Sequence, residues 1–362
     1  VIMTENACNF INPITFETLT GNKCLVDTFD RNFQFNVEHV SLAKLADIFL
    51  VAPASADVIG KIANGIADDM LTTTIMACKC PKLISPAMNT NMFTNPIVQD
   101  NLKKLEHYGY EIIQPDSGYL ACGDTGAGKM PSEQVLLNYI LRTIAKDKDM
   151  TGIKLTVTAG PTREKLDPVR FLSNNSTGKM GYAIAKMAML RGADVTLISG
   201  KVSLEPVPFV KMVDIVSAED MYNAVIKSAK DADIIIKAAA VADYRPSDVS
   251  DEKIKKKDGD MSIPLERTKD IIGTLGSSKR DGLFLCGFSM ETEHMLENSK
   301  VKLTKKNLDM IVANNVKVAG AGFGTDTNVV TVITKDAVEE LPMMSKEEVA
   351  DALLDRIMKA RQ

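Results

Sequence analysis

The residues best suited to bind an anion form one polar stretch near the middle of the 362-residue chain. Segment 158–164 reads TAGPTRE, and segment 174–182 reads NNSTGKMGY. An apolar, strand-like run at 153–157 precedes them, and apolar residues at helical spacing begin near Gly178. A strand, a glycine-containing loop and a helix N-terminus together present backbone N–H groups to an anion. Hydroxyls and a positive charge suited to phosphate come from Ser176, Thr177 and Lys179.

The same stretch has a second interpretation, a polar turn that only caps a helix. Its spacing matches neither the P-loop pattern nor G-x-G-x-x-G, so the residues leave both interpretations open. The segment 320–324 (GAGFG) looks more like a dinucleotide fingerprint, but a β-branched run follows it at 328–333. Because no helix N-terminus is available there for a pyrophosphate, we expect a hairpin-like loop.

Three further features of the second half could belong to an anion site. Asp243 follows an apolar run at 233–240, at the strand end where nucleotides bind in parallel sheets. Lys302 and Lys306 are four residues apart on an expected helix, so like charges point the same way and disfavour the free helix. Lys253 begins a short basic run that could fold over polyphosphate. Each feature also has a plainer interpretation, a solvated turn or a solvated charged face.

A candidate flap lies in the first half, at 116–130. The segment contains four glycines and shows no secondary-structure period. Long loops within compact domains are usually lids or binding loops. Cys122 lies in this segment. Cysteine is more often a small buried hydrophobe than a reactive group, but the glycine-rich setting moves the balance modestly towards chemistry.

Alternating strand and helix patterns must position these residues. In the first half we expect strands at 1–4, 48–52 and 82–85, helices at 12–20, 42–46, 58–70 and 132–143, and a turn at 53–57. In the second half we expect strands at 153–157, 194–199, 233–240, 283–288, 308–313 and 328–333, and helices at 218–230, at 293–306 and after Ser345, where S-x-x-E forms a capping box. Such alternation gives parallel sheets whose ligands lie at the carboxyl ends of the strands.

Composition narrows the class of protein. Charged residues make up 25% and apolar residues 45% of the chain, and the net charge is −4, so we expect no nucleic-acid partner. No apolar stretch approaches the roughly 20 residues that span a bilayer, so we expect no membrane partner. Six cysteines scattered over this length do not suggest a disulfide framework, which favours a cytoplasmic location.

The motifs above, in this order, are typical of one family. In the first half they are EHV-x-LA (38–43), APASAD (52–57), NGIAD (64–68), PAMN (86–89) and ACGD-x-G-x-GKM (121–130). In the second half they are AGPTRE (159–164), DPVRF (167–171), SN (173–174), GKMG (178–181), AAVADY (239–244), KIKK (253–256) and the loop 320–324. The chain resembles the bacterial bifunctional coenzyme A biosynthesis proteins, in which phosphopantothenoylcysteine decarboxylase is fused to phosphopantothenate–cysteine ligase.

The resemblance implies an α/β protein with two doubly wound domains. Residues 1–145 would form a flavodoxin-like FMN-dependent decarboxylase domain, 146–152 a charged linker, and 153–362 a Rossmann-like, CTP-dependent ligase domain. In the family, flavin oxidises the thiol of phosphopantothenoylcysteine, carbon dioxide leaves, and the product is reduced again. The implied catalytic residues are His39, Asn89, which contacts the substrate carboxylate, and Cys122, which donates a proton. The flavin site would be lined by Ser55 and Ala56.

For the second half the resemblance implies that CTP, with Mg²⁺, activates phosphopantothenate to an acyl-cytidylate that the amine of cysteine attacks. Asn174 matches the residue that handles the intermediate, and Lys253 is a second implied catalytic residue. The implied CTP contacts are Asp243, Lys253, Lys269, Asp270, Ile271, Ile272, Phe288, Lys302 and Lys306. Metal ligands are not implied. The family also implies a homo-oligomer, with trimeric flavin units and dimeric ligase units.

The sequence departs from the family pattern at its start. The family's first strand and glycine-rich turn, which help to hold the flavin phosphate, are expected before Val1 and are absent from this numbering. Two other functions fit the residues less well. A nicotinamide-dependent oxidoreductase would need a dinucleotide fingerprint in the right context. A non-catalytic flavoprotein would not need Asn174, Lys253 and Lys302 together.

Overall fold

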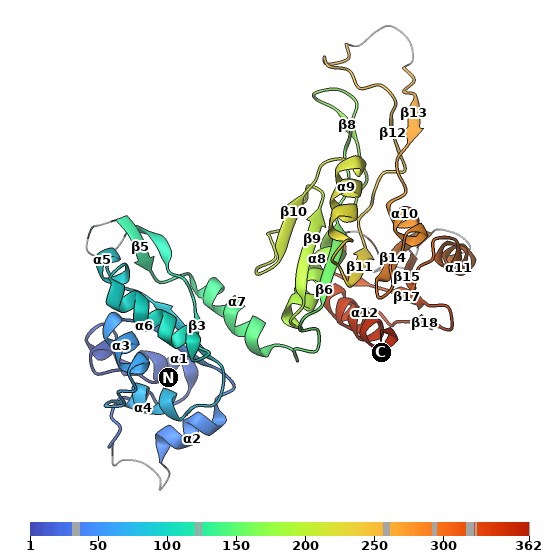
Figure 1. The fold of residues 1–362 in the computed structure, drawn as a ribbon. Coiled ribbons are helices and arrows are strands. Elements are labelled where there is room, and N and C mark those ends of the chain that lie inside the picture. Colours follow the sequence, from blue (N-terminus) through green and yellow to red (C-terminus); the bar gives the residue numbers. More distant parts are fainter. Residues whose placement is uncertain are drawn as a thin grey trace. The chain divides into compact units, whose positions relative to one another are not determined.

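The chain folds into two compact units, Val1–Ala145 and Lys146–Gln362 (Figure 1). The computed structural model describes residues 1–30, 37–119, 123, 125–255, 261–291, 295–315, 322 and 324–361. No helix within these ranges is long and apolar enough to cross a membrane. Each unit is described by itself.

The first unit is built on a small parallel sheet. Its strands, in spatial order, are β1 (Phe49–Ala54), β2 (Lys82–Pro86) and β3 (Glu111–Ile112). Its helical elements are η1 (Ala7–Asn9), α1 (Pro13–Thr20), α2 (Glu38–Leu45), α3 (Ala56–Ala63), α4 (Met70–Ala77), α5 (Thr90–Phe93), α6 (Pro96–His107) and α7 (Glu133–Ile144). Val51 and Ile84 of the sheet share a buried cluster with Ile59 of α3 and Leu105 of α6. This packing holds the carboxyl ends of β1 and β2 in place.

Three local predictions for this unit were wrong. The expected strand at 1–4 forms only one bridge, between Ile2 and Leu25. The expected turn at 53–57 is instead the end of β1 followed directly by α3. The expected helix at 58–70 ends at Ala63, because Gly65 takes a left-handed conformation (φ 71°) that breaks the apolar helical period.

The candidate flap at 116–130 also differs from its prediction. It contains an antiparallel hairpin, β4 (Asp116–Tyr119) and β5 (Thr125–Lys129), rather than a segment without secondary structure. Its glycines hide the alternation of a strand, but two of them are required by close packing. A Cβ on Gly126 would collide with the side chain of Thr90, and one on Gly128 with the carbonyl of Met88. The hairpin therefore packs directly on the loop that follows β2.

The second unit contains an eight-stranded sheet. Its spatial order is β10 (Lys211–Asp214), β9 (Asp194–Ser199), β6 (Lys154–Ala159), β11 (Ile234–Lys237), β14 (Phe284–Glu291), β15 (Met310–Asn315), β17 (Val330–Ile333) and β18 (Val338–Glu340). The first six strands are parallel and the last two antiparallel. The strand order reverses direction between β6 and β11, as in a doubly wound nucleotide-binding fold. The Rossmann-like prediction is confirmed.

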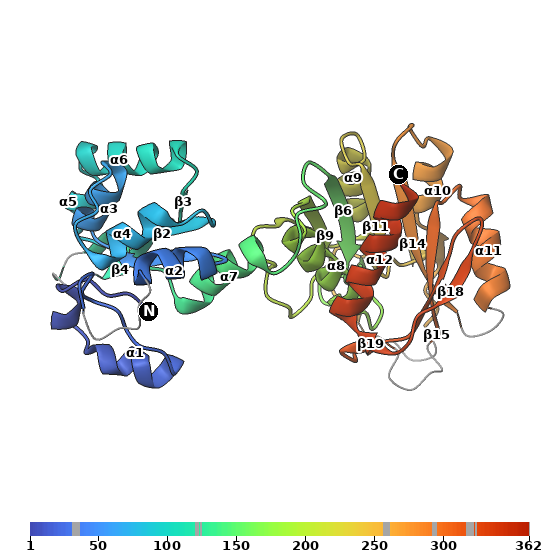
Figure 2. The same ribbon diagram turned by 90° about the horizontal axis from the view of Figure 1, so that it is seen from below.

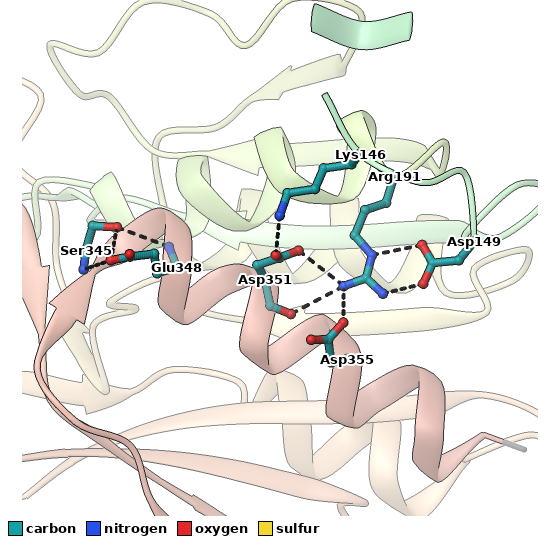
Figure 3. A network of polar contacts seen from close by, with 7 residues as sticks. All are labelled: Lys146, Asp149, Arg191, Ser345, Glu348, Asp351 and Asp355. Atoms are coloured by element: carbon teal, nitrogen blue, oxygen red, sulfur yellow. Dashed lines mark hydrogen bonds and ion pairs between the residues drawn. The ribbon is translucent and has the colours of Figure 1, made fainter. Parts of the chain in front are cut away.

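Helices cover both faces of this sheet. They are α8 (Lys179–Leu190), α9 (Ala218–Ser228), α10 (Ile271–Ser277), α11 (Met295–Lys305) and α12 (Lys346–Ala360). α8 and α12 share one buried cluster with the sheet, and Figure 2 shows α12 lying along that face. α9, α10 and α11 contribute to the cluster on the other face. The capping box predicted at Ser345 is present, with Glu348 as its partner (Figure 3).

Two short hairpins form an arm of the second unit. They are β7 (Glu164–Lys165) with β8 (Phe171–Leu172), and β12 (Tyr244–Pro246) with β13 (Leu265–Arg267). Figure 1 shows β8, β12 and β13 standing away from the main sheet. A further small antiparallel pair joins β16 (Thr327–Asn328) to β19 (Met344–Ser345). The loop 320–324 lies mostly outside the described residues, but strands follow it, as predicted.

The stretch 146–152, expected as a linker, packs as part of the second unit. Met150 is fully buried in the core of this unit. The guanidinium of Arg191 is nearly buried and contacts the carboxylates of Asp149 and Asp355, the latter at 2.7 Å. Asp351 lies beside it and also accepts a hydrogen bond from Lys146 at 2.5 Å (Figure 3). Ion pairs thus fix this charged stretch to α12.

Candidate functional site

The order of the second sheet reverses between β6 and β11, whose carboxyl ends stay joined as far as a bridge between Pro161 and Ala240. β6 runs into Gly160, whose φ of 72° is left-handed, and α8 begins after Gly178, whose φ is 79°. The two glycines approach so closely that a Cβ on Gly178 would lie 3.4 Å from the backbone nitrogen of Gly160. A third glycine, Gly181, lets α8 touch β6, since its Cβ would come within 2.6 Å of the Cβ of Ala159. A tight turn and close helix–strand packing are also what the glycines of a dinucleotide fingerprint provide, at a different spacing.

The N-terminus of α8 clarifies the interpretation that the sequence left open. Its N-cap is Gly178, which has no side chain to accept a hydrogen bond from the first turn. The helix is therefore not capped by a polar side chain at that position, and its N–H groups point to the sheet edge. Lys179 differs from our expectation. Its ammonium lies 2.7 Å from Asp326 and 3.0 Å from the carbonyl of Gly324, so it ties the 324–326 segment to α8.

Asn174 lies at this edge. Its amide donates a hydrogen bond to the carbonyl of Ala240 at 2.8 Å, and its oxygen accepts one from the backbone of Ser176 at 3.2 Å. The loop after β11 is also held by the fully buried Thr162, whose hydroxyl accepts a hydrogen bond from the backbone N–H of Ala242 at 3.0 Å. The side chain of Asn174 is exposed, so it is fixed in place and still accessible to a ligand.

Asp243 lies on the same loop, next to the N-terminus of α10. Its carbonyl accepts a hydrogen bond from the backbone of Thr268 at 3.0 Å, which joins it to the turn 269–272. Asp270 caps α10 by accepting from Gly273 at 3.0 Å and forms an ion pair with Lys306, also at 3.0 Å. Burial alone would raise the pKa of Asp270, but these two partners hold it below its ordinary value.

The other predicted CTP contacts divide into two groups. Lys302 lies 3.3 Å from the hydroxyl of Ser289 at the end of β14, beside the half-buried Phe288. The side chains of Ile271 and Ile272, in the first turn of α10, are buried, so only their backbone can reach a ligand. The ammonium of Lys269 points away, to Glu219 of α9 at 2.7 Å.

Sequence analysis missed one charged residue at this edge, Lys237. It is the last residue of β11 and is half-buried. Burial is the main cause that lowers its pKa, and the ammonium groups of Lys306 and Lys302 add to the effect. The carboxylates of Asp270 and Asp243 oppose the shift without cancelling it. A lysine at the end of an otherwise apolar strand was the pattern that could have revealed it.

Lys253 is not brought to this edge by any hydrogen bond or ion pair among the described residues. It is exposed, and its neighbour Ile254 is anchored to the arm. The buried carboxylate of Asp167 accepts hydrogen bonds from the backbone of Ile254 at 3.1 Å and from the guanidinium of Arg170 at 2.6 Å. Burial by itself would raise the pKa of Asp167, but these donors hold it well below its usual range.

The corresponding edge of the first unit carries neutral groups. Ser55 caps α3 by accepting from Val58 at 3.3 Å, and Asn89 caps α5 by accepting from Asn91 at 2.8 Å. The two loops touch, because the carbonyl of Ala54 accepts a hydrogen bond from Ala87 at 3.0 Å. The structure thus brings Ser55 and Ala56 close to the loop of Asn89. Two buried hydroxyls of this region have no hydrogen-bond partner in the described chain, those of Ser85 and Thr90.

The flap joins the same edge through its base. The backbone of Met88 donates to the carbonyl of Gly128 at 3.0 Å, so β5 is attached next to Asn89. Cys122 itself lies outside the described residues. His39 lies in the first turn of α2, which packs against α4. No hydrogen bond or ion pair between described residues joins His39 to Ser55.

A pocket of about 390 Å³ lies elsewhere, at the foot of the arm. Its lining includes Glu164, Lys165, Ser217, Asp220 and Arg245. None of the predicted site residues is among its lining residues, and the carboxylate of Glu164 is already engaged by the backbone of Ala218 at 2.9 Å. The described residues also contain no cluster of three or more His, Cys, Asp or Glu side chains able to hold a metal ion.

Comparison with known proteins covers both units. The family model described as Flavoprotein matches residues 1–145, and the model described as DNA/pantothenate metabolism flavoprotein C-terminal domain matches residues 150–360. The coenzyme A biosynthesis bifunctional protein CoaBC of Bacillus subtilis (strain 168) is 47% identical over 361 residues, which cover 99% of this chain and 89% of that protein. The match therefore extends through both units.

Two further proteins are similar to the chain. A cysteine/cysteine sulfinic acid decarboxylase from an unknown prokaryotic organism is 42% identical over 354 residues, 96% of this chain and 99% of that protein. The crystal structure of the C-terminal domain of a coenzyme A biosynthesis bifunctional protein CoaBC has 45% sequence identity and a TM-score of 0.51, covering 59% of this chain and 97% of that one.

Proposed function

Because the chain belongs to the family of bifunctional coenzyme A biosynthesis proteins, we propose that it catalyses two successive reactions. The second unit ligates cysteine to phosphopantothenate at the expense of CTP, through an acyl-cytidylate. The first unit decarboxylates the resulting phosphopantothenoylcysteine to phosphopantetheine with FMN. The single observation that supports this assignment best is the match of both units, in order and over 99% of the chain, to one bifunctional relative.

The ligase proposal is supported by the charges at the edge between β6 and β11. Lys302 and Lys306 offer cations to a triphosphate, and Asp270 at the start of α10 holds Lys306 in place. Mg²⁺ would enter with the nucleotide, since it is usually held through substrate phosphates and water. Asn174 projects from the opposite side of the same edge and would position the acyl-cytidylate. Lys253 would reach the site from the arm.

The residues of the first unit fit a flavin. The loops at Ser55–Ala56 and at Asn89 lie together at the carboxyl ends of β1 and β2, and two buried hydroxyls nearby, at Ser85 and Thr90, lack partners. Bound FMN would supply the two-electron redox chemistry that decarboxylation requires. Asn89 would bind the substrate carboxylate, and the flap would close over the site and exclude water. Cys122 would donate a proton from its thiol to the product.

We also propose a homo-oligomer with trimeric flavin units and dimeric ligase units, located in the cytoplasm. The arm supports the ligase contact, because its apolar side chains are exposed in the single chain. They include Val169, Phe171, Tyr244, Val249 and Leu265. A second copy that covers them would bury this surface. In the first unit, His39 would complete the flavin site of a neighbouring subunit.

A direct assay tests the function. Purified protein with Mg²⁺, CTP, phosphopantothenate and cysteine should release pyrophosphate, and with phosphopantothenoylcysteine it should release carbon dioxide. Absence of pyrophosphate would rule out the ligase. Cysteine alone is the control, because one relative is a cysteine/cysteine sulfinic acid decarboxylase. Release of carbon dioxide from free cysteine, but not from phosphopantothenoylcysteine, would make the chain a cysteine decarboxylase instead.

A further inference from the structure

Lys237 occupies the central position of the second unit's sheet edge. It ends β11 and pairs in register with Thr158 of β6 on one side and with Gly287 of β14 on the other. Ile235, two residues earlier, belongs to the buried cluster that includes Ile271, Ile272 and Leu275 of α10. Because alternate strand residues share a face, the side chain of Lys237 also lies on the α10 side of the sheet.

Four charged groups interact electrostatically with Lys237. Asp270 stands at the N-terminus of α10, Lys302 lies on α11, and Lys306 lies just after α11. Asp243 stands on the loop after β11 itself. Lys306 already pairs with Asp270 at 3.0 Å. For Lys237 no hydrogen bond or ion pair to another described residue is found, although it is half-buried.

Fold stability does not account for an amine in this place. Burying an ammonium group without a close partner is unfavourable, and neighbouring ammonium groups add repulsion. An apolar side chain of the same length would keep the packing and remove both costs. Three lysines and two aspartates leave an excess of positive charge at the carboxyl end of β11, where nucleotides bind in parallel sheets. A ligand with several negative charges would offset that excess.

We propose that Lys237 is a third polyphosphate-binding cation of the second unit, acting with Lys302 and Lys306 on the triphosphate of the nucleotide. This inference rests on the proposed ligase function for the identity of the nucleotide, but not for the polyphosphate chemistry. Sequence motifs place Lys302 and Lys306 in the site and leave Lys237 out. Its role follows from its register between Thr158 and Gly287 and from the charges around it.

The proposal has a consequence for pH dependence. In the empty site, burial and the other two lysines hold the pKa of Lys237 below its ordinary value. A bound polyanion stabilises the ammonium form and raises that pKa again. Between the lower and the higher value, binding takes up a proton, so affinity falls as pH rises through this window. Asp270, whose pKa is held below its ordinary value, stays ionised there and contributes no slope.

Calorimetric titration of the full-length protein with inorganic tripolyphosphate, and separately with CTP, tests the proposal. Lys237→Met should weaken the binding of both by about 10- to 100-fold, the range for a lost charged hydrogen bond. Lys237→Arg should retain most of the affinity. Lys227→Met, which removes an exposed lysine from α9, is the matched control and should bind like the wild type. Repeating the titration in buffers of different ionisation enthalpy should show proton uptake that Lys237→Met loses.

Thermal unfolding without ligand separates a binding role from a structural one. Lys237→Met should unfold at the same temperature as the wild type or higher, because it removes a poorly compensated charge and keeps the aliphatic stem. Equal affinity of Lys237→Met and wild type for tripolyphosphate, with equal proton uptake, would overturn the proposal, and so would a lowered unfolding temperature that accounts for the lost binding. If tripolyphosphate binds as expected but CTP supports no pyrophosphate release, the ligase function fails and the cation site stands.

Discussion

The carboxyl edges of the two sheets, each proposed to bind a ligand, differ in charge. The edge of the second unit is charged, and a single chain brings Asn174, Asp243, Asp270, Lys302 and Lys306 to it. The edge of the first unit is neutral, formed by helix caps and unpaired hydroxyls. A polyanionic substrate requires cations fixed in advance, whereas a flavin brings its own reactive group and requires mainly shape and hydrogen bonds.

The two edges also differ in the elements that carry their residues. In the second unit the residues that would handle CTP lie on strands, caps and helices of one compact body. In the first unit Ser55 and Asn89 lie on the loops after β1 and β2, whereas His39 lies on α2, which packs against α4. We propose that the ligase site is built within one chain and that the flavin site also draws on a neighbouring subunit.

The largest effect is expected from a substitution in the flap, which should impair the reaction of the first unit and leave that of the second unit intact. Cys122→Ser should lower the rate at which phosphopantetheine forms by about 10²- to 10⁴-fold, the usual range for a lost general acid. The rate of ligation should stay unchanged. Carbon dioxide should still be released, and an oxidised product should accumulate, because the proton donor for the last step is missing. Mass spectrometry of the product checks this. Full turnover to phosphopantetheine would remove Cys122 from its role.

A second test concerns the charged edge alone. Lys306→Met should raise the KM for CTP by about 10- to 100-fold, because it removes a cation held in place by Asp270. Lys305→Met is the control, since Lys305 is exposed and next to it in sequence. Steady-state pyrophosphate release measures both. Equal values of KM for the two variants would show that Lys306 does not contact the nucleotide.

Substituting one helical glycine in each unit compares how closely the helices pack there. Gly181→Ala should destabilise the protein by about 1–2 kcal/mol, because the new methyl would press on Ala159 of β6. Gly60→Ala, in α3 of the first unit, meets only ordinary contacts and should stabilise by about 0.5–1 kcal/mol through helix propensity. Denaturant unfolding measures both free energies. Stabilisation by Gly181→Ala would mean that α8 does not approach β6 as closely as described.

The smallest effect is expected at the arm. The pKa of Asp167 is depressed in the folded protein, so its contribution is present above the unfolded-state value and is lost as pH falls through the folded value. Asp167→Asn should remove this contribution at neutral pH and flatten the pH dependence of stability in the acid range. The rate of proteolytic cleavage near Lys253 and Lys255, measured as a function of pH, reports whether this part of the arm is anchored. An unchanged cleavage profile would show that Asp167 does not anchor Ile254.

Much of the fold follows from apolar periodicity. The six predicted strands of the second unit begin and end within a few residues of their predictions, because buried strands are nearly continuous apolar runs, whereas β10 and β18 were not predicted. The flap was misjudged because its glycines, required by packing against Thr90 and Met88, carry no alternation. The helix predicted at 58–70 was too long because one left-handed glycine outweighs an uninterrupted apolar period.

The site was less predictable than the fold. Motifs located Asn174, Asp243 and the lysines at 302 and 306, but only the topology brings them together. Spacing alone could not decide the role of the glycines at 160, 178 and 181, because a long insertion separates the first from the others. Lys237 was missed because a single lysine after three isoleucines resembles the end of a strand, and its meaning depends on neighbours distant in sequence.

One experiment tests most directly whether the two edges are separate sites. Asn174→Ala should lower pyrophosphate release from CTP, phosphopantothenate and cysteine by about 10²- to 10³-fold, the usual loss for a group that stabilises developing charge. The same protein, supplied with phosphopantothenoylcysteine, should release carbon dioxide at the wild-type rate. A parallel loss of both reactions, or of neither, would contradict the assignment of one reaction to each unit.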